Sequence, residues 1–110
     1  MTIISIILHG RLRRKKAYRQ QISEVLANDQ EVRFYETKAA GHARHLTSMA
    51  IRYGTDCIVE AGVNGTLNEV VNGMMDEQGA GRGNVALAVF PVGSGNDFAK
   101  IFRVGNKPGD

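Results

Sequence analysis

Three short runs of nearly unbroken apolar residues constrain the fold of this chain more than any other feature of its sequence. They are TIISIIL from Thr2 to Leu8, DCIVEA from Asp56 to Ala61, and VALAVFPV from Val85 to Val92. Strands that are apolar along their whole length are typical of a parallel sheet with both faces covered. A fourth run, EVRFYE from Glu31 to Glu36, alternates as a short strand does. We therefore expect four strands.

Residues with helical spacing separate these runs. The first helical stripe lies between Lys16 and Ala27, and the second ends at Gly54, where glycine readily adopts the left-handed conformation that closes a helix. The apolar positions of the three stripes are Tyr18, Ile22, Val25 and Leu26, then Ala39, Ala43, Leu46, Ala50 and Ile51, then Leu67, Val70, Val71 and Met74. Because strand and helix alternate, the sequence predicts an α/β fold, a three-layer α/β/α sandwich with a mostly parallel sheet.

The bulk properties indicate one globular domain of 110 residues, with 43% hydrophobic and 23% charged residues. The single cysteine, Cys57, has no partner for a disulfide within the chain, and a core thiol fits a reducing, cytoplasmic setting. The N-terminus lacks a positively charged leader and its apolar run is too short to span a bilayer, so we expect no targeting segment. The polar ending RVGNKPGD, Arg103 to Asp110, is typical of a linker and predicts one lobe of a longer protein.

Positive charge is concentrated near the N-terminus. The net charge is +3, and residues 1–60 carry ten Lys or Arg against six Asp or Glu, whereas residues 61–110 carry four against five. The excess comes from RLRRKK, Arg11 to Lys16. Two interpretations stay open, a solvated loop and helix start, or a patch that attracts phosphate or an anionic membrane surface. Aromatic residues are not interleaved with the basic ones, so we expect no nucleic-acid site.

The loop in VEAGVNGTLNEVVNG follows the third expected strand. In open α/β sheets, ligands bind beyond the carboxyl ends of the strands. Gly62 and Gly65 would let the backbone approach a ligand, and the following helix N-terminus offers N–H groups to phosphate. Thr66 and Glu69 fit a capping box, in which each side chain satisfies a free backbone donor of the first turn. A tight turn is the alternative interpretation of the same residues.

The loop PVGSGNDFAK, which follows the fourth expected strand, has the same character. Gly93 and Gly95 permit a tight turn, and Ser94, Asn96 and Asp97 place a hydroxyl, an amide and a carboxylate at a helix start, where N-capping is the alternative role. The apolar segment FAKIF, Phe98 to Phe102, is expected to form a last helical turn.

Histidines do not predict a metal centre. His9, His42 and His45 have no metal-ligand spacing with Cys57 or with a carboxylate cluster, so we assign no metal ligands. His42 and His45 are three residues apart on an expected helix, and we expect both to face solvent.

Three of these motifs together resemble a known family. AGVNGTLNEVVNG resembles the Gly-Gly-Asp-Gly-Thr-x-Asn-Glu-Val signature of the diacylglycerol kinase catalytic domain and its bacterial lipid-kinase relatives. PVGSGNDFAK resembles their Pro-x-Gly-[Ser/Thr]-x-Asn-Asp-Phe-Ala loop, and ILHG, Ile7 to Gly10, resembles the turn that ends their first strand. The superfamily includes NAD kinases and sphingosine kinases, and NDFA, Asn96 to Ala99, favours the diacylglycerol-kinase branch.

The resemblance implies a Rossmann-like N-terminal domain, here residues 1–110, that binds ATP with Mg²⁺. It also implies a C-terminal β-sandwich domain, which these 110 residues lack, and transfer of the γ-phosphoryl group to a lipid hydroxyl. A lipid would bind only if that second domain is supplied. The nucleotide-binding positions that the resemblance implies are Gly10, Arg11, Gly62, Val63, Asn64, Gly65, Thr66, Asn68, Glu69, Gly93, Ser94 and Asn96.

Two positions depart from the family signature. Val63 stands at the second Gly, where a β-branched residue disfavours positive φ, and Asn64 stands at the Asp, whose charge it lacks. Asn64 is the catalytic position that the resemblance implies. Without the carboxylate of the family Asp, we expect a loss of transition-state stabilisation on the order of several kcal/mol. We therefore expect a truncated or degenerate lipid-kinase domain. A non-catalytic interaction or regulatory module of the same fold, bound to a partner or an anionic membrane, and an NAD-kinase-type enzyme are the alternatives.

Overall fold

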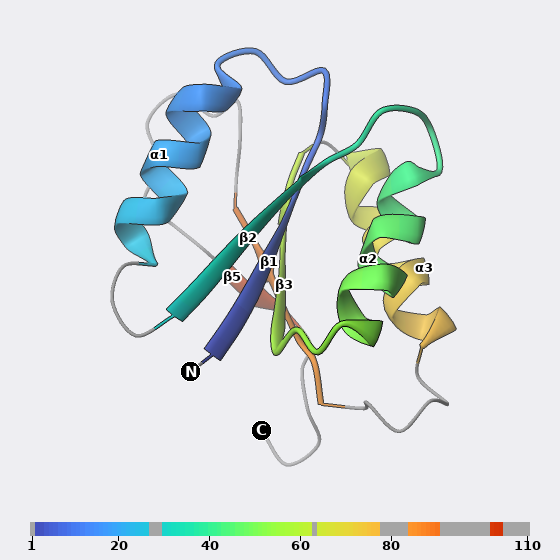
Figure 1. Ribbon diagram of the computed structural model, residues 1–110. Helices are drawn as coiled ribbons and strands as arrows, with labels where there is room; N and C mark the ends of the chain where they lie inside the picture. Colours follow the sequence, from blue (N-terminus) through green and yellow to red (C-terminus); the bar gives the residue numbers. More distant parts are fainter. Residues whose placement is uncertain (1, 27–29, 63, 78–83, 91–101, 105–110) are drawn as a thin grey trace.

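The computed structural model describes residues 2–26, 30–62, 64–77, 84–90 and 102–104 and shows one twisted sheet between helices (Figure 1). In chain order the elements are β1 (Thr2–Leu8), α1 (Lys15–Val25), β2 (Gln30–Glu36), α2 (His42–Arg52), β3 (Cys57–Ala61), α3 (Asn64–Asp76), β4 (Ala86–Val89) and β5 (Phe102–Val104). Within the described ranges the strand order is β2-β1-β3-β4-β5, and the first four strands run parallel. The prediction of an α/β fold with a mostly parallel sheet is confirmed.

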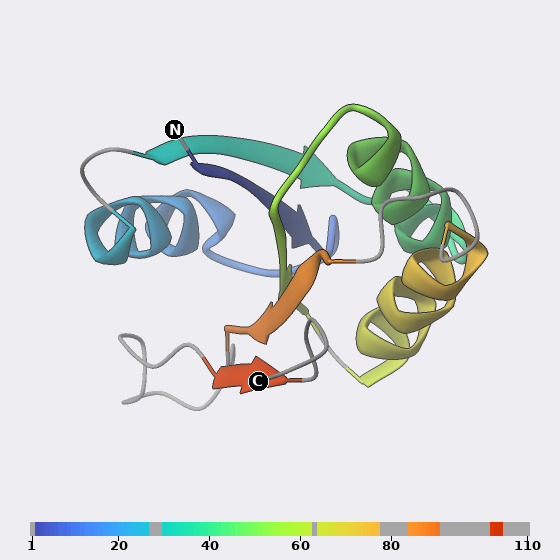
Figure 2. The same ribbon diagram turned by 90° about the horizontal axis from the view of Figure 1, so that it is seen from below.

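The sheet separates two apolar cores, as the continuous apolar runs predict. Helix α1 covers one face, and α2 and α3 cover the other (Figures 1 and 2). On the α1 side, Tyr18 and Ile22 pack on alternate residues of β1, including Ile6. On the opposite side, Ile7 and Ile58 pack against α2 and α3. Each fully buried side chain of this size stabilises the fold by about 1.5–3 kcal/mol. Both faces of the sheet are therefore covered by stabilising apolar contacts.

Helices α2 and α3 approach each other closely at Gly73. A Cβ at this position would lie 2.5 Å from the Arg44 carbonyl oxygen and 2.8 Å from Cβ of Thr47. The Arg44 guanidinium also makes two hydrogen bonds of 2.7 Å to the Asp76 carboxylate. These contacts hold the C-terminal part of α3 against the first half of α2.

Most helix boundaries agree with the sequence pattern, and three apolar positions differ, among them Val25 of α1, which is 44% exposed. Gly54 has the left-handed φ of 94° that we expected after the second helix. Helix α2 begins only at His42, however, so Ala39 lies in the loop before it instead of on the apolar stripe. Val71 is 37% exposed although Val70 is buried. The buried face of α3 is therefore narrower than the set of its apolar residues.

The C-terminal part of the chain differs more from the expectation. Phe102 was expected in a helical turn and Arg103 at the start of a linker, but Phe102–Val104 is strand β5. It pairs antiparallel with β4, with Val89 opposite Phe102 and Leu87 opposite Val104. Pairing satisfies the backbone groups that β4 would otherwise leave open at the sheet edge, an effect that local sequence does not show.

The described residues contain no helix with the length and apolar character that a bilayer crossing would require.

Candidate nucleotide site

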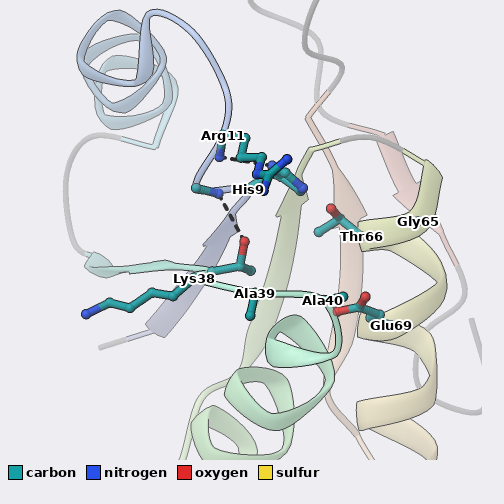
Figure 3. A pocket seen from close by; sticks show the side chains of 10 residues that line it. His9, Arg11, Lys38, Ala39, Ala40, Gly65, Thr66 and Glu69 are labelled. Atoms are coloured by element: carbon teal, nitrogen blue, oxygen red, sulfur yellow. Dashed lines mark hydrogen bonds between the residues drawn. The ribbon is translucent and has the colours of Figure 1, made fainter.

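A cavity of about 470 Å³ lies where β1 and β2 end and α3 begins (Figure 3). Three segments wall it, the loop after β1, the loop between β2 and α2, and the first turns of α3. The residues that line it are His9, Gly10, Arg11, Thr37, Lys38, Ala39, Ala40, Gly65, Thr66 and Glu69. The cavity thus occupies the carboxyl edge of the sheet, where open α/β folds bind ligands.

Gly10 joins two of these walls. Its N–H donates a hydrogen bond of 3.0 Å to Oγ1 of Thr37, and a Cβ at Gly10 would lie 1.9 Å from the Thr37 carbonyl oxygen. Thr37 is itself held by a hydrogen bond of 3.0 Å from its N–H to the Leu8 carbonyl. The loop after β1 can pass this close to the end of β2 only because residue 10 has no side chain.

His9 is the first residue after β1, and its ring orientation is fixed by the backbone. Nδ1 accepts a hydrogen bond of 3.1 Å from the N–H of Arg11, and the His9 N–H donates to the Ala61 carbonyl at 3.0 Å. An Nδ1 that accepts a hydrogen bond is unprotonated, so Nε2 carries the hydrogen and is the free donor of the neutral ring. Both backbone N–H groups of Gly10 and Arg11 are already used, so this loop can offer a ligand only its side chains.

Positive charge remains available beside the cavity. Lys15 donates to the Gly10 carbonyl at 2.8 Å and pairs with Glu36 at 3.2 Å, and Arg19 also pairs with Glu36. Hydrogen bonds from Arg19 and then Lys15 hold the pKa of Glu36 below its ordinary value. Arg11 and Lys38 are exposed, and neither forms an ion pair with another described residue. Figure 3 shows that the Lys38 side chain extends away from Glu69. Arg11 lies beside His9 in the same view.

Glu69 does not take part in the capping box that the sequence predicted. Helix α3 begins at Asn64, so Thr66 already lies inside its first turn. The two carboxylate oxygens of Glu69 instead accept hydrogen bonds from the N–H groups of Gly41, at 3.0 Å, and Ala43, at 3.1 Å. Glu69 therefore caps the N-terminus of α2, a role that depends on tertiary packing and is invisible in the local Thr-x-x-Glu pattern.

Gly62 and Gly65 have different surroundings. Gly65 is exposed and lines the cavity, and apart from its own helix backbone and chain neighbours no heavy atom of the described residues lies within 4 Å of where its Cβ would be. A Cβ at Gly62 would instead lie 2.9 Å from both Oε2 of Glu60 and Oγ1 of Thr66. Gly65 leaves the backbone at the α3 N-terminus open to a ligand, whereas Gly62 leaves room for two polar side chains beneath it.

Glu60 is a polar residue of this region that the sequence analysis passed over. It lies in β3, is only 2% exposed, and burial raises the pKa of its carboxyl to about 7. Its Oε2 has no hydrogen-bond partner among the described residues. The signal in the sequence was a carboxylate inside the apolar run CIVEA.

The structure brings together five of the residues that the resemblance implied, namely Gly10, Arg11, Gly65, Thr66 and Glu69. Gly62 precedes α3 and does not line the cavity, and Asn68 is exposed on α3 outside the cavity lining. Asn64 is described only as the first residue of α3, and Val63, Gly93, Ser94 and Asn96 lie outside the described residues. Nucleotide binding at these positions stays a prediction.

The sequence missed His9, Thr37, Lys38, Ala39 and Ala40 as cavity residues. Their only sequence signal is their position directly after an expected strand. His45 is exposed as expected, but His42 is half-buried, and its Nδ1 accepts a hydrogen bond of 2.9 Å from the N–H of Lys38.

Across the described ranges, no three His, Cys, Asp or Glu side chains gather in a way that could hold a metal ion. The cavity carboxylate, Glu69, uses both oxygens for backbone N–H groups. The described side chains therefore do not form a Mg²⁺ site by themselves.

Comparison with known proteins gives a consistent result. The family model described as the diacylglycerol kinase catalytic domain matches residues 6–110. A probable YegS-like lipid kinase of Pseudomonas aeruginosa is 29% identical over 105 residues, which cover 96% of this chain and 33% of that protein. A diacylglycerol kinase of Bacillus subtilis is 31% identical over 96 residues, covering 82% of this chain and 30% of that protein. The chain spans about a third of the length of the curated relatives it matches.

Proposed function

The chain belongs to the diacylglycerol kinase catalytic domain family, and from that premise we propose that it is the ATP-binding part of a lipid kinase. The cavity at the carboxyl edge of the sheet is the observation that carries this proposal. It combines an open backbone at Gly65, a helix N-terminus without acidic residues in its first turn, and the free cation Arg11. These features favour a ligand with several negative charges.

Each wall of the cavity has its own part in holding the phosphates. The first N–H groups of α3 would bind phosphate oxygens, and Gly65 would let them come close because it carries no side chain. Nε2–H of His9 and the guanidinium of Arg11 would approach from the loop after β1. Glu69 would act indirectly, because it holds the loop before α2 in place through two hydrogen bonds.

When bound, ATP supplies the γ-phosphoryl group for transfer to a lipid hydroxyl. The family names of the relatives support a lipid hydroxyl as the acceptor, and the second domain that the resemblance implies would present it. Because Asn64 lacks the charge of the family Asp, we propose that transfer is impaired in this form of the domain.

ATP titration tests the proposal directly. Millimolar ATP should raise the melting temperature of the wild-type chain, and Arg11→Ala should weaken ATP binding several-fold because a cation beside the phosphates is lost. Arg33→Ala is the matched control, since Arg33 pairs with Glu31 on β2 and does not line the cavity. The proposal is wrong if ATP leaves the melting temperature unchanged, or if Arg33→Ala weakens binding as much as Arg11→Ala does.

A double reversion tests the impaired loop. Val63→Gly with Asn64→Asp restores the two family residues, and in the presence of Mg²⁺ it should tighten ATP binding relative to the parent chain. Equal affinity of parent and revertant would show that these two substitutions have not weakened the loop.

A second function, binding to an anionic membrane, is favoured by the segment Arg11–Lys16. Four of its cations form no ion pair with other described residues and are exposed, namely Arg11, Arg13, Arg14 and Lys16. Clusters of this kind attract anionic lipid, each cation contributing about 1 kcal/mol near the surface. Co-sedimentation with vesicles that contain phosphatidylserine should occur at low salt and disappear at high salt, and sedimentation with neutral vesicles would contradict this function.

A further inference from the structure

Glu60 is an ionisable side chain enclosed by the central part of the sheet. In the strand register it lies between Ile7 of β1 and Val89 of β4. Only 2% of it is exposed, and its Oε2 has no hydrogen-bond partner among the described residues. A buried carboxyl without a partner is costly in its ionised form, so such a group needs an explanation other than stability.

The unpartnered oxygen lies close to the segment that joins β3 to the candidate phosphate site. It lies 2.9 Å from the position of a Cβ on Gly62, the residue with which the chain leaves β3 toward α3. Oγ1 of Thr66 lies at the same distance from that position, and Thr66 lines the cavity. The Glu60 carboxyl therefore lies close to the first turn of α3, which lines the cavity through Gly65 and Thr66.

The other titratable groups around this position do not offset the charge of Glu60. His9, after β1, uses Nδ1 for the N–H of Arg11, and Glu69, on α3, uses both oxygens for the N-terminus of α2. The Asp76 and Glu77 carboxylates lie near the far end of α3 and pair with arginines of α2.

β4 contributes only apolar residues, Ala86–Val89. The remaining ionisable groups of α2 are His42, Arg44, His45 and Arg52. Burial alone raises the pKa of Glu60 to about 7, so none of these groups stabilises its ionised form appreciably.

We propose that Glu60 sets the phosphate affinity of the α3 N-terminus through its own charge. With a neutral carboxyl beneath it, the N-terminus has its full positive potential available for a phosphate. With an ionised carboxylate, the same potential is already compensated from below and a phosphate is repelled. Phosphate binding is thus coupled to uptake of one proton by Glu60, and this coupling rests on the proposed ATP site.

The test compares ATP affinity at pH 6 and pH 8 in three proteins, the wild-type chain, Glu60→Gln and Glu60→Met. At pH 8 about one-tenth of a carboxyl with a pKa of about 7 is neutral, so wild-type affinity should be about tenfold below that of both variants. At pH 6 the three affinities should agree. The ionisation of ATP is the same in all three titrations, so it cancels in the comparison. Met, which is apolar and similar in length, repeats the test should the amide of Gln disturb the fold.

Calorimetric titration of ATP in two buffers of different ionisation enthalpy gives a second readout. At pH 8 the wild-type chain should take up close to one proton more per ATP than either variant. Identical pH profiles in all three proteins, with ATP bound, would overturn the role of Glu60 and leave the ATP site standing. Absence of ATP binding at both pH values in all three would overturn the ATP site and this coupling together.

Discussion

Replacing Gly10 by alanine tests whether the cavity depends on close contact between two loops. A Cβ at Gly10 would lie 1.9 Å from the Thr37 carbonyl oxygen, whereas real contacts of a Cβ are essentially never below 3.0 Å. The two loops must therefore separate by about 1 Å, since 3.0 Å minus 1.9 Å is 1.1 Å. Such a movement strains the hydrogen bonds from Gly10 to Thr37 and from Thr37 to Leu8.

The expected cost follows from these contacts. Overpacking of this kind costs about 1–3 kcal/mol, and each weakened hydrogen bond adds up to about 1 kcal/mol. We expect Gly10→Ala to lower the free energy of unfolding by about 2–4 kcal/mol in total. Urea denaturation followed by circular dichroism measures this quantity, with the transition midpoint decreasing and the slope unchanged.

Gly65→Ala is the matched control for this experiment. Among the described residues, no heavy atom outside the local backbone lies within 4 Å of the added methyl group, and Gly65 is inside α3, where alanine is the better helix former. Its free energy of unfolding should stay the same or rise by up to about 1 kcal/mol, while ATP binding should weaken because the methyl group projects beside the cavity. A Gly10→Ala protein as stable as Gly65→Ala would refute the close contact between the loops.

Three further changes have defined expectations. Glu69→Ala should lower the free energy of unfolding by about 1–2 kcal/mol in thermal or urea denaturation, because α2 loses its N-terminal cap; no change would mean that its carboxylate does not cap α2. The pKa of Glu60 is raised from 4.5 to about 7 on folding, so the wild-type chain should lose stability as the pH rises from 4.5 to 7, whereas Glu60→Gln should not and should be more stable at pH 8 by about 2–3 kcal/mol. Parallel stability curves for these two proteins would contradict the raised pKa. Arg44→Ala should leave the urea midpoint nearly unchanged, because its pair with Asp76 is exposed to solvent, and a decrease as large as that of Glu69→Ala would be inconsistent with that exposure.

The layers of this domain and its mostly parallel sheet follow from local patterns in the sequence. A run such as Thr2–Leu8 has apolar residues on both sides of the strand, and the structure places Ile6 and Ile7 in opposite cores. Strand β5 did not follow, because its three residues carry little apolar pattern and are held by pairing with β4. Local periodicity indicates which residues are buried, but it does not indicate which distant strand a short strand will pair with.

The candidate site was predictable to a similar extent. Gly65 was identified from the turn chemistry of its neighbours, and Gly10 from the resemblance of ILHG to the turn that ends the family's first strand. Thr37 and Lys38 were missed because nothing near them in the sequence marks a ligand, and they reach the cavity only through the pairing of β2 with β1. The role of Glu69 was misassigned for the same reason, since its partner is another helix.

Helices α2 and α3 are joined along their whole length. Glu69 accepts a hydrogen bond at the start of α2, and Gly73 lies close to the Arg44 carbonyl. After the end of α3, Glu77 accepts hydrogen bonds from Ser48 and Arg52. The two helices therefore behave as one block, and their amide protons should exchange with solvent in one shared opening event. The parts of the cavity wall that carry Ala40, Gly65 and Glu69 should then move together.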